Sequence, residues 1–194
     1  MKTCCIVDMG GVMVTNHDVT PAVAAHLGLS AAQVRDYSNE YVIALMEGKI
    51  TTAMFWELFT ERCGIVVQEE LLGKFFHPIR NEAMYKFIQK LKQTHRVVCG
   101  TNSIEEHYAF HLARGDYDVF DIIYPSHKIG VAKPQAAFYA YILEQEHCIP
   151  SQALFIDDLL ENVEAARRLG IRAFHFTNDK TLKAQMFSEG EMSF

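Results

Sequence analysis

The sequence lacks long hydrophobic runs, an excess of basic residues and the cysteine spacing of a metal site. No apolar stretch approaches the ~20 residues that span a bilayer, and no signal-peptide pattern precedes the first strand-like segment. The formal net charge is -6, and lysine and arginine are scattered along the chain. Because nucleic acid is bound by clustered basic residues, we expect no nucleic-acid partner. We also expect no membrane partner and a cytoplasmic location.

Proline and glycine are scarce, and the chain has no low-complexity segment, linker or internal repeat. The 194 residues include only 5 Pro and 11 Gly, and 49% of them are hydrophobic. This composition excludes a disordered chain and is sufficient for one core with a small accessory lobe. The five cysteines are an odd number, and we predict reduced thiols within the core. Nothing in the sequence fixes the oligomeric state, and we expect a monomer or a weak homodimer.

Short apolar runs alternate with helix-like segments along most of the chain. Buried strands are predicted over residues 3–7, 96–100, 122–124, 153–156 and 172–176. Helices are predicted over residues 81–94, 103–114, 134–146 and 161–169, with one more short helix after Lys180. This alternation predicts an α/β fold with a doubly wound parallel sheet.

The interval 16–80 departs from this alternation, because helix signals follow one another there without a strand pattern. Ser30 is predicted to cap a helix that runs to Met46, and Thr51 or Thr52 to cap a helix that runs to Cys63. The interval is several times longer than one crossover helix with its turns. We therefore predict a small all-helical cap over residues 16–80, inserted into a core domain of residues 1–15 and 81–194.

The first predicted strand ends in a carboxylate and a glycine-rich turn, Asp8-Met9-Gly10-Gly11. Open α/β sheets bind ligands at the carboxyl ends of their strands. A glycine pair lets backbone N–H groups approach a phosphoryl oxygen closely. The alternative is a tight turn in which Asp8 only caps backbone amides, and this motif alone does not separate the two interpretations.

Thr101, Asn102 and Ser103 follow the second predicted strand at the start of a helix. Hydroxyl and amide donors at a helix N-terminus form an anion site. For Ser103 we favour ordinary N-capping, because Glu106 lies three residues later and completes a capping box.

Lys133 precedes a proline, and two adjacent acids follow the fourth predicted strand. Pro134 in the first turn of a helix would direct the Lys133 ammonium toward the sheet edge, although a lone lysine is usually exposed. Asp157 and Asp158 repel each other unless a cation intervenes, and Asn162 follows closely. Oxygen ligands at a strand end are typical of Mg²⁺ sites. The alternative is N-capping of the next helix by either acid.

Taken in order, these four motifs resemble those of the haloacid dehalogenase-like (HAD) hydrolase superfamily, over nearly the whole chain. The helical cap, with Glu47-Gly48-Lys49-Ile50 followed by Phe55-Trp56, resembles that of subfamily I, which has a helical C1 cap. Within it the chain is similar to bacterial phosphatases of the glucose-1-phosphate type. The resemblance implies a Mg²⁺-dependent phosphatase that hydrolyses a small phosphorylated metabolite, such as a sugar phosphate, through an aspartyl-phosphate intermediate.

The resemblance also implies a role for each matching residue. Asp8 would be the nucleophile, and Lys133 would steady both Asp8 and the phosphoryl group. Phosphate would be bound by Gly10, Gly11, Thr101, Asn102 and Lys133. Mg²⁺ would be bound by Asp8, the Gly10 carbonyl and Asp158, with support from Asp157 and Asn162.

One position departs from the family pattern. Most phosphatases of this superfamily carry a second Asp where this chain has Gly10, and that Asp protonates the leaving oxygen. General acid–base catalysis is commonly worth about 10²–10⁴-fold in rate, so we expect substrates whose leaving group departs without full protonation, such as anomeric sugar phosphates or acyl phosphates. His17 is a candidate substitute acid, although a surface-loop histidine is the favoured interpretation.

Two other functions stay open. A metal-independent haloacid dehalogenase also uses a nucleophilic Asp, but such enzymes tend to carry an aromatic residue at the position of Gly10. A non-catalytic phosphometabolite-binding protein would bind its ligand in the presence of metal without turnover. Substrate choice is expected to depend on the cap, where Tyr41, Glu47 and Trp56 are candidate pocket residues, with helix packing as the alternative for Tyr41 and Trp56.

Overall fold

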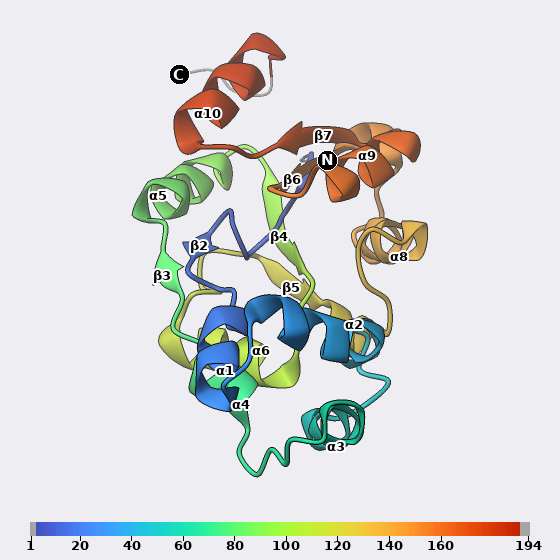
Figure 1. Cartoon of the computed structure of the whole chain (residues 1–194). Helices are drawn as coiled ribbons and strands as arrows, with labels where there is room; N and C mark the ends of the chain where they lie inside the picture. The colour runs from blue at the N-terminus through green and yellow to red at the C-terminus, as the bar shows by residue number, and fades with distance from the viewer. Residues whose placement is uncertain (1–2, 191–194) are drawn as a thin grey trace.

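A five-stranded parallel sheet forms the centre of the molecule. The computed structural model describes residues 3–190, and its main sheet has the strand order β5-β4-β1-β6-β7 (Figure 1). The strands are β1 (Cys4–Val7), β4 (Arg96–Thr101), β5 (Ile122–Pro125), β6 (Ala153–Asp157) and β7 (Arg172–His175). Every neighbouring pair is parallel. All five predicted strands and the α/β class are confirmed.

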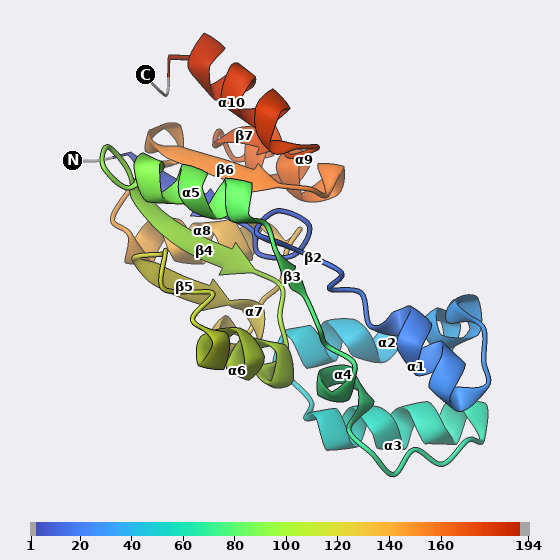
Figure 2. The same cartoon turned by 90° about the vertical axis from the view of Figure 1, so that its left-hand side faces the viewer.

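Helices cover both faces of this sheet. They are α5 (Glu82–Leu91), α8 (Ala136–Gln145), α9 (Leu160–Arg168) and α10 (Asp179–Ser188). Because successive side chains of a strand point to opposite faces, Cys5 and Val7 pack with α5 and α10, whereas Cys4 and Ile6 pack with α8 and α9. Figure 2 shows α5 in front of the sheet and α8 behind it. The doubly wound arrangement is thus confirmed; residues 191–194 of the predicted tail lie outside the described residues.

A helical insert between β1 and β4 has an apolar core of its own. It consists of α1 (Thr20–Leu27), α2 (Ala31–Met46), α3 (Thr52–Cys63) and α4 (Leu71–Lys74). Ser30 caps α2 in a capping box with Gln33, and Thr51 caps α3, which confirms the two predicted helix starts. Phe55, Trp56 and Phe59 of α3 pack edge to face at the centre of this core. The insert lies on the side of the sheet toward which the strands point (Figure 2).

A short antiparallel ladder joins the insert to the rest of the chain. β2 (Val14–Thr15) precedes the insert and β3 (Ile79–Arg80) follows it, with Val14 opposite Arg80. The prediction that residues 16–80 are helical throughout is therefore wrong at β3. Two residues are too few to show an alternating pattern in the sequence.

Two further helices lie on the side of the insert, and a 3-10 turn (Pro150–Gln152) precedes β6. α6 (Glu105–Arg114) contacts α4, and α7 (Ser126–Ile129), which the sequence did not indicate, contacts α2. None of the described helices is both long enough and apolar enough to cross a membrane. The five cysteines all lie in the described part of the chain and are free. Cys4, Cys5 and Cys99 are buried as predicted, whereas Cys63 and Cys148 are half-buried.

Candidate active site

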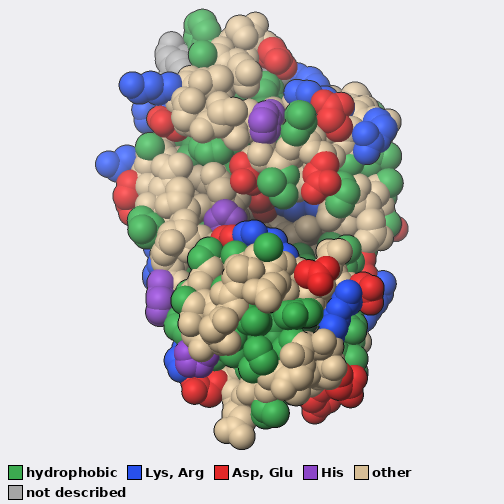
Figure 3. Space-filling view, in the orientation of Figure 1, with side chains coloured by type: hydrophobic (Ala, Val, Ile, Leu, Met, Phe, Trp, Pro, Cys, Tyr) green, Lys and Arg blue, Asp and Glu red, His purple; other side chains and the backbone are tan. Residues whose placement is uncertain are grey.

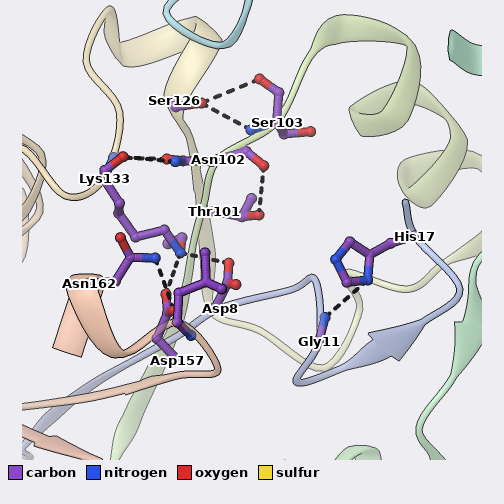
Figure 4. A network of polar contacts seen from close by, with 12 residues as sticks. Asp8, Gly11, His17, Thr101, Asn102, Ser103, Ser126, Lys133, Asp157 and Asn162 are labelled. Atoms are coloured by element: carbon purple, nitrogen blue, oxygen red, sulfur yellow. Dashed lines mark hydrogen bonds and ion pairs between the residues drawn. The ribbon is translucent and has the colours of Figure 1, made fainter. Parts of the chain in front are cut away.

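The carboxyl ends of three neighbouring strands bring the predicted site residues together. The Asp8 N–H donates to the Ile156 carbonyl at 2.9 Å, which holds Asp8 beside Asp157 at the end of β6. Thr101 is the last residue of β4, on the other side of β1. Asp8, Thr101 and Asp157 are all buried, and Figure 4 shows them in one network of polar contacts. The parallel register of the sheet thus places these residues at one edge.

The Lys133 ammonium lies at the centre of this network. Its Nζ is 2.7 Å from Asp8 Oδ1 and 2.7 Å from Asp157 Oδ2, and it donates to the Gly100 carbonyl at 3.0 Å (Figure 4). These three contacts use all three ammonium protons. Burial lowers the pKa of Lys133, but attraction by Asp8 and Asp157 outweighs it, and the pKa lies above its usual value. Lys133 is therefore a buried, permanently charged cation rather than an exposed lysine.

Asp157 accepts hydrogen bonds from the protein at both carboxylate oxygens. Besides the Lys133 contact at Oδ2, Asp157 Oδ1 accepts from the Leu159 N–H at 2.8 Å and from Asn162 Nδ2 at 2.9 Å. The side chain is fully buried, whereas Asp158 is half-buried. Of the two adjacent acids, Asp158 is thus the one with more freedom to bind a ligand.

Asn102 fixes the backbone of Lys133. Its Nδ2 donates to the Lys133 carbonyl at 3.0 Å, and the Lys133 N–H donates to Asn102 Oδ1 at 2.8 Å. Pro134 is not in the first turn of α8, which begins at Ala136, so that prediction is wrong. Lys133 nevertheless points to the sheet edge, because Asn102 holds the loop from the neighbouring strand.

The capping box predicted at Ser103 is also wrong. α6 begins at Glu105, and its N-cap residue Ile104 has no side-chain cap. The Ser103 N–H donates instead to Ser126 Oγ at 3.0 Å, and Glu106 accepts a 2.5 Å hydrogen bond from Thr52 of the insert.

Three carboxylates lie close together at this edge, and two of them contact the Lys133 ammonium. One oxygen from each of Asp8, Asp157 and Asp158 lies within 4.8 Å of the others. Burial and the charge of Asp157 raise the pKa of Asp8, and Lys133 lowers it. The net result is a pKa raised to about 7. Burial and Asp157 likewise raise the pKa of Asp158. The ionised cluster is short of positive charge, and its hard oxygen donors suit Mg²⁺. The residues present therefore fit a divalent cation.

Gly11 is required for the position of Asp158. Gly11 has φ +70°, and a Cβ atom there would lie 2.0 Å from Asp158 Oδ2. Both the left-handed backbone and the close carboxylate exclude a side chain. The second position of the motif thus has to be a glycine because the Asp158 carboxylate lies against it. The sequence did not indicate this reason.

His17 lies beside the turn that follows Asp8. Its Nδ1 accepts a hydrogen bond from the Gly11 N–H at 3.3 Å, which leaves Nε2 as the donor atom of the neutral ring (Figure 4). The ring is exposed, as a surface-loop residue would be, but it also lines the cavity between the core and the insert. His17 is therefore next to the site rather than remote from it.

The family of the chain follows from its sequence as well as from this site. A profile of haloacid dehalogenase-like hydrolases matches residues 2–170, which is most of the chain. The chain belongs to the haloacid dehalogenase-like hydrolase family. This HAD hydrolase is 26% identical over 187 residues to a D-ribitol-5-phosphate phosphatase of Bacteroides thetaiotaomicron, and the match covers 89% of this chain and 91% of that protein.

Two fungal proteins match shorter stretches of this HAD hydrolase. Drimenol cyclase drtB of Aspergillus calidoustus is 32% identical over 114 residues, and sesquiterpene phosphatase astK of Aspergillus oryzae is 38% identical over 63 residues. These matches cover 56% and 32% of this chain. They cover only 22% of the cyclase and 32% of the phosphatase, so the chain spans a third or less of these relatives.

A solved structure of another HAD family enzyme has the same fold. That enzyme, from Bacteroides thetaiotaomicron, was crystallised in complex with magnesium and inorganic phosphate. It superposes with a TM-score of 0.78 at 19% sequence identity and covers 94% of this chain and 99% of its own. At this identity the likeness establishes the fold.

Proposed function

We propose that this HAD hydrolase is a Mg²⁺-dependent phosphatase that transfers the phosphoryl group of a small phosphate monoester to Asp8. One arrangement supports the proposal above all, namely the buried Lys133 bound to Asp8 and Asp157, with the Asp158 carboxylate alongside. A lone capping Asp would not require a buried ammonium and two further acids. A dehalogenase, which needs no metal, would not require the acidic cluster.

The reaction divides one difficult displacement into two. A carboxylate oxygen of Asp8 attacks phosphorus, the bond from phosphorus to the ester oxygen breaks, and the alcohol leaves with a proton. Water then attacks the aspartyl-phosphate, which releases inorganic phosphate and regenerates Asp8. Asp8 must be ionised to attack, and the Lys133 charge at 2.7 Å favours that state.

The remaining residues orient and neutralise the phosphoryl group. Asp8, the Gly10 carbonyl and Asp158 would hold Mg²⁺, which when bound supplies positive charge to the phosphoryl oxygens. Thr101 and the Gly10 amide would bind those oxygens, and the Gly11 N–H would join them once it is released from His17 Nδ1. The Asn102 side chain already bonds to the backbone of Lys133. Its proposed contact with phosphate would therefore come from the Asn102 backbone N–H or from the second proton on Nδ2. When Asp8 carries the phosphoryl group, its carboxylate has lost its charge. The Lys133 proton that bound this carboxylate then becomes available to the phosphoryl oxygens.

Gly10 has no side chain that could donate a proton, and His17 is our candidate for that role. To act as an acid and end as a neutral ring, His17 has to carry protons on both nitrogens, so its Nδ1 would release the hydrogen bond that it accepts from Gly11. From this imidazolium, Nε2 would protonate the leaving oxygen, and the neutral ring would then accept a proton from the attacking water.

The helical insert is proposed as the cap of a subfamily I enzyme similar to the glucose-1-phosphate type, with domain limits at residues 16 and 80. Trp56 lines the cavity beneath it, whereas Tyr41 and Glu47 are not among the described residues that line it. Glu47 instead accepts a hydrogen bond from Gln135, beside the Lys133 loop. The names of the relatives favour two kinds of substrate, a polyol phosphate and a sesquiterpene phosphate, and the expected sugar phosphate belongs with the first.

Phosphate release from p-nitrophenyl phosphate tests this function. We expect turnover with Mg²⁺, loss of turnover with EDTA, and loss in Asp8→Asn, with the exposed Asp118→Asn as an unaffected control. Rapid acid quench followed by peptide mapping should place a phosphoryl group on Asp8. Metal-independent halide release from a 2-haloacid would establish the dehalogenase instead. Metal-dependent binding without turnover of any ester would establish a binding protein.

A further inference from the structure

A cavity of about 610 Å³ lies between the helical insert and the sheet edge. Gly10, Thr101 and Asn102 line its inner end, next to Asp8. Figure 3 shows a groove across this face, between the part of the molecule that holds the sheet and the part that holds α1–α3, with charged side chains and histidine along it. The volume is in the range of ~300–1,000 Å³ typical of small-molecule sites. A molecule in this cavity would have one end at Asp8 and the other in the insert.

The end of the cavity in the insert is apolar. Its walls come from α1, α2, α3 and the start of α6, and the apolar residues include Val23, Val34, Leu45, Phe55, Trp56 and Ile104. Each of these six side chains is also part of the buried apolar core of the insert. The cavity is therefore an extension of a hydrophobic core and not a polar groove.

Most polar side chains at this end already have partners, and among the described side chains that line it Trp56 Nε1 is a buried donor without one. Arg35 and Asp18 form an ion pair at 3.1 Å, and both are largely exposed at the rim. The Ser38 hydroxyl donates to the Val34 carbonyl at 2.8 Å inside α2. A sugar or polyol needs several donors and acceptors that are free to pair with its hydroxyl groups, because each unpaired buried polar group costs binding free energy. This end of the cavity offers few of them.

The two histidines of α6 in the cavity wall do not change this conclusion. His107 contacts the Leu72 carbonyl at 3.2 Å, and His111 contacts Asp116 at 2.7 Å. Burial lowers the pKa of His107 to about 4 and also lowers that of His111. Both rings are therefore neutral at physiological pH, so they provide no cation for a second anionic group on the substrate.

We infer that the substrate is the phosphate monoester of an apolar alcohol of medium length, aliphatic or terpenoid, with its phosphate at Asp8 and its hydrocarbon between α1, α2 and α3. The inference rests on the proposed function for the position of the phosphate. It replaces the expected sugar phosphate, because the wall beyond the phosphate is built for hydrocarbon. Each methylene that enters the cavity should raise affinity about fourfold until the space is filled.

The single tryptophan of the chain provides a binding test that does not depend on turnover. Trp56 lines the cavity, so its fluorescence should change when hydrocarbon enters. We would titrate the Asp8→Asn variant, with Mg²⁺ present, with ethyl, butyl, octyl and geranyl phosphate below their aggregation limits, and with ribitol 5-phosphate and inorganic phosphate. The dissociation constant should fall about fourfold per methylene from ethyl to octyl. It should be highest for ribitol 5-phosphate and inorganic phosphate.

Two variants of α2 and one control connect this trend to the cavity, which Val42 and Met46 both line. Met46→Gln puts an amide in the wall and should weaken octyl phosphate at least tenfold while leaving inorganic phosphate unchanged. Val42→Phe fills space and should exclude the octyl and geranyl esters but not the ethyl ester. Ile43→Gln is the matched control, since Ile43 is 54% exposed on the same helix and does not line the cavity.

The outcomes separate this inference from the proposed function. A dissociation constant that does not depend on chain length, or tighter binding of ribitol 5-phosphate than of octyl phosphate, overturns the apolar substrate even if the wild-type protein releases phosphate. Binding that strengthens with chain length supports the apolar substrate even if no ester is hydrolysed. In that case only the proposed phosphatase activity is contradicted. An effect of Ile43→Gln as large as that of Met46→Gln also overturns it.

Discussion

The imidazole of His17 stands against the Cα of Gly10, in the space that a side chain at position 10 would enter. A Cβ atom on Gly10 would lie 3.1 Å from Cδ2 and 3.2 Å from Nε2 of His17. Such contacts are closer than ordinary van der Waals distances, so a larger residue at position 10 requires the exposed His17 ring to shift by a few tenths of an ångström or more. A carboxylate at position 10 and the imidazole would thus compete for the space beside Gly10.

Replacement of His17 by Gln should affect substrates according to their leaving group. If His17 protonates the leaving oxygen, kcat/KM for an alkyl phosphate, which reports the step that releases the alcohol, should fall about 10²–10⁴-fold. For p-nitrophenyl phosphate, whose phenolate leaves without a proton, kcat/KM should change little. Steady-state kinetics on both esters measures the difference. The exposed His26→Gln is the control, and an equal loss on both esters would show that His17 has only a structural part.

An Asp at position 10 should function only when His17 is removed. In the His17→Ala variant, Gly10→Asp introduces a carboxylate into the space left by the ring, and we expect it to restore at least a tenth of the wild-type kcat on an alkyl phosphate. In the wild-type background Gly10→Asp has to displace His17 and should give no gain. If the effects of the two substitutions on kcat are additive in the same assay, the side chains at positions 10 and 17 do not compete for this space.

Asp8→Asn should stabilise the metal-free protein at high pH. Burial raises the pKa of Asp8 from 3.8 to about 7, so the folded state binds this proton more tightly than the unfolded state, and stability is lost as pH rises between these values. Urea unfolding in EDTA should show equal stability of the two proteins near pH 4. Near pH 8 the variant should be more stable, by on the order of 1–4 kcal/mol. A wild-type protein that is the more stable of the two at pH 8 would show that Lys133 fully compensates the burial.

Mg²⁺ should stabilise the fold through Asp158. At a concentration 100 times its Kd, a ligand adds about 2.7 kcal/mol to the stability of the folded state, which corresponds to a rise in Tm of roughly 5–10 °C for a chain of this size. Asp158→Asn removes a carboxylate from the cluster and should shift the Mg²⁺ dependence of Tm to concentrations at least about tenfold higher. Asp118→Asn should leave the titration unchanged. A wild-type Tm that does not respond to Mg²⁺ would count against a metal site.

The sequence predicted those parts of the site that local patterns determine. Asp8, Thr101 and Asp157 each follow a recognisable strand, and parallel strands end at the same edge, so their proximity was predictable. The contact between Asn102 and Lys133 was not, because it joins residues 31 positions apart without any local signal. Likewise, the sequence left His17 as a surface residue, since its position depends on the turn at Gly11.

The wrong predictions show the same limit. Ser103 and Glu106 fit the pattern of a capping box, but Thr52 of the insert takes the Glu106 carboxylate. That competition comes from a residue 54 positions away and appears only after folding. Local propensity is thus overridden where the insert meets the core, which is also where the substrate is proposed to bind.

The ladder of β2 and β3 makes the insert exchangeable. Thr15 and Ile79 are paired across it, so the chain leaves the core and returns to it at one point, and a two-residue β-turn would be enough to close the gap. Chimeras that keep His17 and receive residues 18–78 from another family member should keep the Asp8–Lys133 chemistry and acquire the donor's substrate range. Evolution has the same route available, since substrate preference can diversify in residues 18–78 without disturbing the order of the strands.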